Sequence, residues 1–120
     1  MRRLRIRVGF AARWSTEVPI PLERDPRAID AVLTYPEWRC GIEFIVRLYD
    51  CQGQLRPIHL KQRDAGLQRM VVVVRATHAN RRAVRAAGSY LAEAFPLGTR
   101  ATLAALEAGR DPGVNGLVLL

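Results

Sequence analysis

The segment Met70-Val-Val-Val-Val-Arg75 contains the longest uninterrupted apolar run of the chain, Met70 to Val74. Four consecutive β-branched residues are typical of a strand that is buried on both faces, usually in a sheet covered by helices. A membrane span needs about 20 apolar residues, so this run is too short to cross a bilayer. The segment therefore predicts a central strand of an α/β fold, and we expect no membrane partner.

Three segments before this run alternate between apolar and polar residues, as half-buried strands do. They cover residues 14–20, 28–34 and 41–50, with a hairpin loop at 35–39. Residues 3–12 also alternate, so a strand and a short basic helix both remain open there.

Helical spacing appears on both sides of the valine run. Pro57 is tolerated only in a first turn, so the helix over residues 54–65 is expected to begin near Leu55 and to stop at Gly66. Thr77 or Asn80 is expected to cap a helix through residue 95. A further helix at 99–108 and an apolar strand at 114–120 complete a mixed central sheet flanked by helices.

Length and composition indicate one globular domain over residues 1–120. The chain is 49% hydrophobic and 25% charged, which excludes a disordered tail and a disulfide miniprotein. No apolar segment follows the arginines of the basic N-terminal segment, residues 1–13, as a secretory signal requires. We therefore expect a cytoplasmic location.

The net charge is +8, with eighteen arginines and one lysine. Part of this arginine content reflects GC-rich coding, but a basic domain still attracts phosphate polymers. We expect weak, non-specific DNA binding through the N-terminal segment and through Arg63, Arg81, Arg82 and Arg85. The alternative is that these arginines are ordinary solvated surface residues.

The two cysteines, Cys40 and Cys51, flank a predicted strand. An extended strand holds its ends much farther apart than the roughly 7 Å that a disulfide allows between Cα atoms. Both thiols are therefore expected to be free.

Two acids are predicted on the polar sides of neighbouring strands, Asp30 and Glu43. If the strands pair as a hairpin, both carboxylates leave the same face and repel each other unless a cation or a proton lies between them. Such a pair suits Mg²⁺ or Mn²⁺, and a metal there would assist phosphodiester chemistry. The alternative is that each acid pairs with an arginine, for example Glu43 with Arg47.

The order of several short segments resembles a domain that often follows a helix-turn-helix module in regulator-like proteins of GC-rich bacteria. The matching segments are Thr16-Glu-Val-Pro-Ile-Pro21, Ala28-Ile-Asp-Ala-Val32, Gly41-Ile-Glu43, Leu60-Lys61 with Arg63-Asp64, Thr77-x-x-Asn-Arg-Arg82, Phe95-Pro96 and Ala108-Gly-Arg-Asp-Pro-Gly113. That domain is similar to the PD-(D/E)xK nuclease-like fold, the restriction-endonuclease and junction-resolvase core. The resemblance implies a restriction-endonuclease-like core in which an Asp on one strand and a Glu-x-Lys or Glu-x-Glu on the next hold a metal.

Carried over by position, Asp30 and Glu43 are the two metal-binding acids, and Ile45 stands at the third position. Isoleucine neither binds a metal nor orients a water. Lys61 on the next helix is a substitute if it reaches back, and Gln52 is a helix-borne supporting residue. Glu17 on the preceding strand is a further acid.

Three functions follow from these observations. The first is a DNA-associated accessory domain with a degenerate nuclease-like fold and little or no catalysis. The second is a Mg²⁺-dependent DNA endonuclease that uses Asp30, Glu43 and Lys61. The third is a sensor or dimerisation module of a transcription regulator, acting as a homodimer, since a fold does not fix a function. A helix-turn-helix formed by residues 80–95 and 99–108 is a weaker interpretation, because the second helix offers mainly Ala and Leu.

Overall fold

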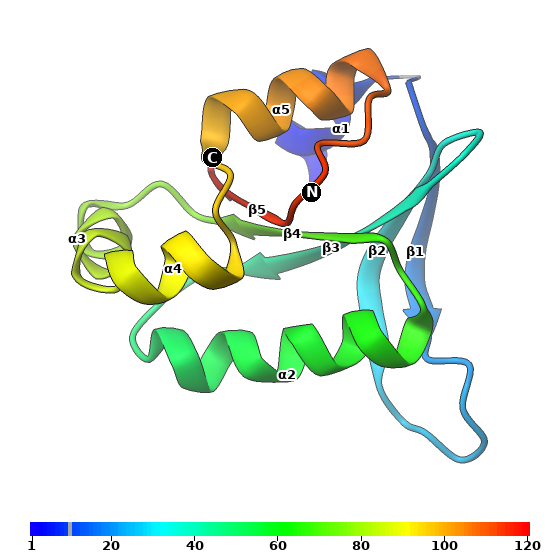
Figure 1. The fold of residues 1–120 in the computed structure, drawn as a ribbon, viewed down its shortest axis with the longest axis horizontal. Helices are drawn as coiled ribbons and strands as arrows, with labels where there is room; N and C mark the ends of the chain where they lie inside the picture. The colour runs from blue at the N-terminus through cyan, green and yellow to red at the C-terminus, as the bar shows by residue number, and fades with distance from the viewer. Residues whose placement is uncertain (10) are drawn as a thin grey trace.

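The computed structural model describes residues 1–9 and 11–120, and within them the chain forms a five-stranded mixed sheet with five helices (Figure 1). The elements are α1 (Arg2–Val8), β1 (Arg13–Pro19), β2 (Ala28–Thr34), β3 (Arg39–Ile45), α2 (Cys51–Ala65), β4 (Arg69–Val74), α3 (His78–Ala86), α4 (Gly88–Ala94), α5 (Thr99–Ala108) and β5 (Gly116–Leu119). The strands lie in chain order, and β2 alone runs against the other four. The predicted α/β class with a mixed sheet flanked by helices is therefore confirmed.

The valine run is β4, and its side chains enter two separate cores. Val71 and Val73 pack beneath α1 and α5, whereas Met70, Val72 and Val74 pack beneath α2 and α4. Figure 1 shows the same arrangement, with α1 and α5 on one face of the sheet and α2, α3 and α4 on the other. Burial of the strand on both faces was the prediction made from its composition.

Residues 2–8 of the N-terminal segment form helix α1, so the strand interpretation is wrong for them, while residue 10 of the predicted alternation lies outside the described residues. Leu4 and Val8 are four residues apart and both are buried, while Ile6 between them is 71% exposed. This is helical spacing, because residues four apart share one face of a helix. The apparent alternation placed Ile6 with the buried residues.

The strand predicted over residues 41–50 ends at Ile45. The backbone that follows is held by side chains instead of a neighbouring strand. Asn80 Oδ1 accepts from Leu48 N at 2.9 Å, and Asn80 Nδ2 donates to Val46 O at 2.9 Å. Gln54 Oε1 accepts from the two amides just before α2, at 2.8 and 2.9 Å. Residues 46–50 therefore form a loop fixed by polar side chains.

Helix α2 begins at Cys51, earlier than predicted. Asp50 caps it, with Oδ1 accepting from Gly53 N at 3.1 Å. This cap fixes the start of the helix at Cys51, although Pro57 had suggested a start near Leu55. Pro57 lies inside the helix and leaves one helical hydrogen bond unmade. Gly66 ends the helix with a left-handed φ of 64°, as predicted.

The helix predicted through residue 95 is divided at Ala87 into α3 and α4. Glycine weakens a helix interior, and Gly88 follows the break. Thr77 is the cap of α3, accepting from Asn80 N at 3.1 Å, whereas Asn80 is buried.

Helices α4 and α5 do not form a helix-turn-helix. Leu91 of α4 packs in the core beneath α2, whereas Leu103 and Leu106 of α5 pack on the opposite face of the sheet. The segment between them pairs with the sheet edge through Leu97 and Gly116. None of the described helices is long and apolar enough to cross a membrane.

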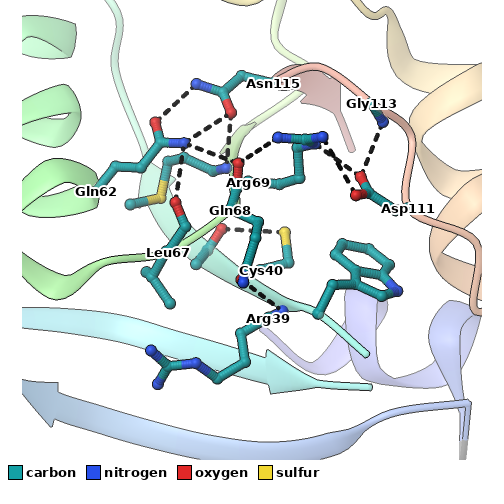
Figure 2. Close-up of polar contacts among 12 residues, drawn as sticks. Arg39, Cys40, Gln62, Leu67, Gln68, Arg69, Asp111, Gly113 and Asn115 are labelled. Atoms are coloured by element: carbon teal, nitrogen blue, oxygen red, sulfur yellow. Dashed lines mark hydrogen bonds and ion pairs between the residues drawn. The ribbon is translucent and has the colours of Figure 1, made fainter. Parts of the chain in front are cut away.

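A polar network closes the end of the sheet where β4 begins, as Figure 2 shows. Asn115 Nδ2 donates to Gln62 Oε1 at 2.8 Å, and Asn115 Oδ1 accepts from Met70 N at 2.9 Å. Beside this pair, Arg69 forms an ion pair with Asp111 at 2.7 Å. These contacts fix the last turn of α2 and the turn before β5 against β4.

Candidate functional site

The two predicted acids lie on adjacent strands in matching register. β2 and β3 are antiparallel, and the last paired positions are Ala31 with Ile42. The next positions along the two strands are Asp30 and Glu43, so the sequence places the two acids opposite one another. Beyond Ala31 and Ile42, Phe44 N donates to the side-chain Oδ2 of Asp30, at 2.8 Å. The acid therefore replaces a backbone acceptor at the point where the strands separate.

Glu43 is nearly enclosed, with 5% of its surface exposed. It lies on the α2 face of the sheet, because Ile42 and Phe44 beside it pack toward α1 and α5. Burial and, after it, a hydrogen bond with the Asp30 carboxyl raise the pKa of Glu43 to about 7, although the Lys61 ammonium opposes both. Near neutral pH this carboxyl therefore lies close to its titration midpoint.

Lys61 reaches back from α2 to the acids. Its Nζ lies 2.6 Å from Glu43 Oε1, and its side chain is 21% exposed. The residue one turn earlier on the same helix face, Ile58, is buried in the core. Asp64, one turn later, forms an ion pair with Arg27 at 2.7 Å, which ties this end of α2 to the start of β2. The structure thus brings together Asp30, Glu43 and Lys61.

The other predicted site residues lie apart from this group. Gln52 is exposed in the first turn of α2, nine residues before Lys61, which is about 13 Å along a helix axis. Ile45 is half-buried two residues after Glu43 and packs against the core beneath α2. Glu17 is exposed on β1 with a φ of 49°. Across residues 1–9 and 11–120, no three His, Cys, Asp or Glu side chains are grouped to hold a metal ion.

The arginines predicted to bind DNA fall into two places. Arg81, Arg82 and Arg85 are exposed on α3, which carries no acid in its first turn. Arg63 lies in the last turn of α2, where its Nε contacts Asp64 at 2.9 Å. Twelve helical residues, about 18 Å, separate that turn from the start of α2, and Figure 1 shows α3 near this start. The three α3 arginines form a group that excludes Arg63.

Asn80 has a role that the sequence did not reveal. It is 1% exposed and joins the loop after β3 to the loop after β4 through Leu48 N, Val46 O and Arg75 O. In the sequence, Asn80 could only be interpreted as a possible helix cap, because Asn is common at the start of helices. Its contacts with the two loops depend on the tertiary structure. Both cysteines are free, as expected.

Two carboxylates match the number that Mg²⁺ commonly takes from a protein, with water filling the remaining positions. The donor set of Asp30 and Glu43 therefore fits a hard divalent cation. Lys61 already supplies one positive charge to the same pair. No protein family, characterised protein or solved structure matches this chain in the comparisons made.

Proposed function

We propose that this chain is a DNA-associated accessory domain with a degenerate PD-(D/E)xK nuclease-like core and little or no catalytic activity. The mixed sheet with helices on both faces supports a restriction-endonuclease-like core. So does the meeting of Asp30 and Glu43 from neighbouring strands, the arrangement that the sequence resemblance implies.

Ile45 at the third motif position is the observation that carries this proposal, because the acid pair lacks the motif residue that would orient a water. The Lys61 ammonium, 2.6 Å from Glu43 Oε1, neutralises one charge of the acid pair beneath α2. Ile45 offers no group to orient an attacking water at the third motif position, and positioned acid–base groups contribute about 10²–10⁴-fold to a rate. Lys61 therefore compensates the acid pair, while the third motif position supplies no group to activate a water.

Association with DNA is supported by the α3 arginines. Arg81, Arg82 and Arg85 are exposed, and within the described part of the chain none forms an ion pair with an acid. Contacts from guanidinium groups to phosphates give affinity that falls with salt and hardly depends on sequence.

A salt titration of duplex binding tests this association. The double variant Arg81→Ala with Arg82→Ala should lower the slope of log affinity against log salt by up to about two. Arg100→Ala on α5 removes an exposed arginine from another helix and should leave the slope nearly unchanged. An unchanged slope in the double variant would remove α3 from the interface. The absence of binding at low salt would favour the sensor or dimerisation module.

A metal-dependent endonuclease is the second candidate, and the position of Lys61 favours it. Asp30 and Glu43 would hold Mg²⁺ or Mn²⁺, which when bound supplies charge stabilisation at a phosphodiester. Lys61, at 2.6 Å from Glu43, takes the place of the missing motif lysine in this version.

Plasmid cleavage in Mg²⁺ separates the two candidates. We expect little or no cutting by the unaltered chain, and any trace should vanish in Asp30→Asn and Glu43→Gln. Ile45→Lys adds an ammonium to the strand that bears Glu43 and should raise metal-dependent cutting. Robust cutting that is lost in Lys61→Ala would establish the endonuclease instead. Cutting that survives both acid substitutions would refute the site.

A further inference from the structure

A cavity of about 360 Å³ lies where the parallel strands β3 and β4 end. Its walls come from the first turn of α1, from residues 44–46, from the end of β4 and from Leu120 after β5. Ligands of α/β proteins commonly bind outside the carboxyl ends of the strands, and small-molecule sites occupy about 300–1,000 Å³. The position and the size both match a ligand site.

Three arginines line this cavity: Arg2, Arg3 and Arg75. Over residues 1–9 and 11–120, none of the three forms an ion pair with an Asp or Glu. By contrast, Arg7, which lies on α1 with Arg2 and Arg3, pairs with Glu107 at 3.1 Å. Three guanidinium groups around one cavity, each without an Asp or Glu partner, favour an anion. Their planar donors match the oxygens of a phosphate.

The other side chains of the lining are apolar. Phe44 and Val73 form part of the wall, and Val46, which is 66% exposed, lies at its edge. An inorganic anion alone would gain nothing from this surface, because apolar side chains do not replace its hydration. A ligand that joins a phosphate to a flat ring system uses both parts of the cavity.

The backbone that carries Arg75 is held in place before any ligand binds. Its N–H donates to Ile45 O at 3.0 Å. Its carbonyl accepts from Asn80 Nδ2 and from Thr77 N, each at 2.9 Å. A fixed anchor reduces the conformational entropy that binding would otherwise cost.

We propose that this cavity binds a nucleoside monophosphate group, with Arg2, Arg3 and Arg75 on the phosphate and Phe44 beside the base. The same chemistry occurs in a free nucleotide and in the 5′-phosphorylated end of a DNA strand. The proposal does not depend on the proposed function, since its phosphate and base contacts use neither the acid cluster nor the three α3 arginines.

Calorimetric titration of the whole chain with AMP at low salt tests the proposal. One saturable site is expected, with weaker binding of adenosine and of inorganic phosphate. Arg75→Ala should weaken AMP binding about tenfold or more, the effect of losing a charge-assisted contact. Arg3→Ala should act in the same direction, and Arg100→Ala is the control for net charge.

Phe44→Leu keeps the charge and should weaken AMP more than phosphate. A 5′-phosphorylated and a 5′-hydroxyl oligonucleotide then distinguish the two sources of the ligand. Discrimination between them that depends on Arg75 indicates a strand end, and binding of AMP alone indicates a free nucleotide. Equal losses in Arg75→Ala and Arg100→Ala, more than one site per chain, or no binding of either ligand would overturn the assignment.

Discussion

Replacing Glu43 by glutamine should make the protein more stable at alkaline pH and should change its stability little at acidic pH. Glutamine has nearly the shape of the protonated acid. Its carbonyl can still accept from Lys61, and its amide can donate to Asp30. The substitution therefore removes the ionisation of Glu43 while retaining the packing beneath α2.

The size of the effect follows from the raised pKa of Glu43. Burial, followed by the hydrogen bond with Asp30, raises this pKa from 4.5 to about 7. Between these values the folded chain binds a proton that the unfolded chain lacks, so the free energy of unfolding falls as pH rises. One pKa unit corresponds to about 1.4 kcal/mol, so the loss above pH 7 approaches about 3 kcal/mol. This is a large part of the 5–15 kcal/mol that roughly spans domain stabilities.

Urea denaturation between pH 5 and pH 8.5 measures the prediction. The advantage of Glu43→Gln should be small at pH 5 and should grow to about 2–3 kcal/mol at pH 8.5. Glu23→Gln, an exposed acid in the loop before β2, controls for the change in net charge. If Glu43→Gln is less stable than the parent at pH 8.5, the Lys61 contact outweighs burial and the raised pKa is refuted.

Three further predictions concern the metal, the thiols and the loops. Mg²⁺ at pH 8.5 should raise the denaturation midpoint of the parent chain more than that of Glu43→Gln, because binding to the folded state stabilises it; equal shifts in thermal scans would argue against the acid pair as the metal site. Thiol titration of the denatured, unreduced protein should count two groups, Cys40 and Cys51, and a count of zero on a monomer would contradict the structure. Asn80→Ala leaves Leu48 N and Val46 O without their partner and removes one of the two donors to Arg75 O. It should destabilise the chain by about 2–4 kcal/mol in urea denaturation. A loss under about 0.5 kcal/mol, the size of a surface substitution, would show that water replaces the side chain.

The fold class could be predicted because its signals are local. The valine run and the three segments predicted as strands before it do form strands, and β2 agrees with its predicted bounds. The N-terminal helix was ambiguous because Leu4, Ile6 and Val8 satisfy a period of two, and only packing against α5 reveals that Leu4 and Val8 are the buried pair.

The end of β3 was not predictable from its own residues. Alternation continues through Leu48, but Asn80, 32 residues later, takes the loop amide and ends the strand. The candidate site likewise has one part that local sequence predicts and one part that it does not. The pairing of Asp30 with Glu43 follows from hairpin register, whereas the reach of Lys61 depends on where α2 crosses the sheet.

Asp30 performs a task that has nothing to do with chemistry, since its carboxylate completes the hydrogen bonding of Phe44 N where β2 and β3 part. A descendant that had lost every catalytic step would still need an acceptor there, and alanine would fray the hairpin. Asparagine supplies an equivalent oxygen without the charge. Natural variation at position 30 therefore distinguishes two kinds of selection. Free exchange between Asp and Asn would indicate a structural role alone, whereas retention of Asp would indicate selection for its negative charge.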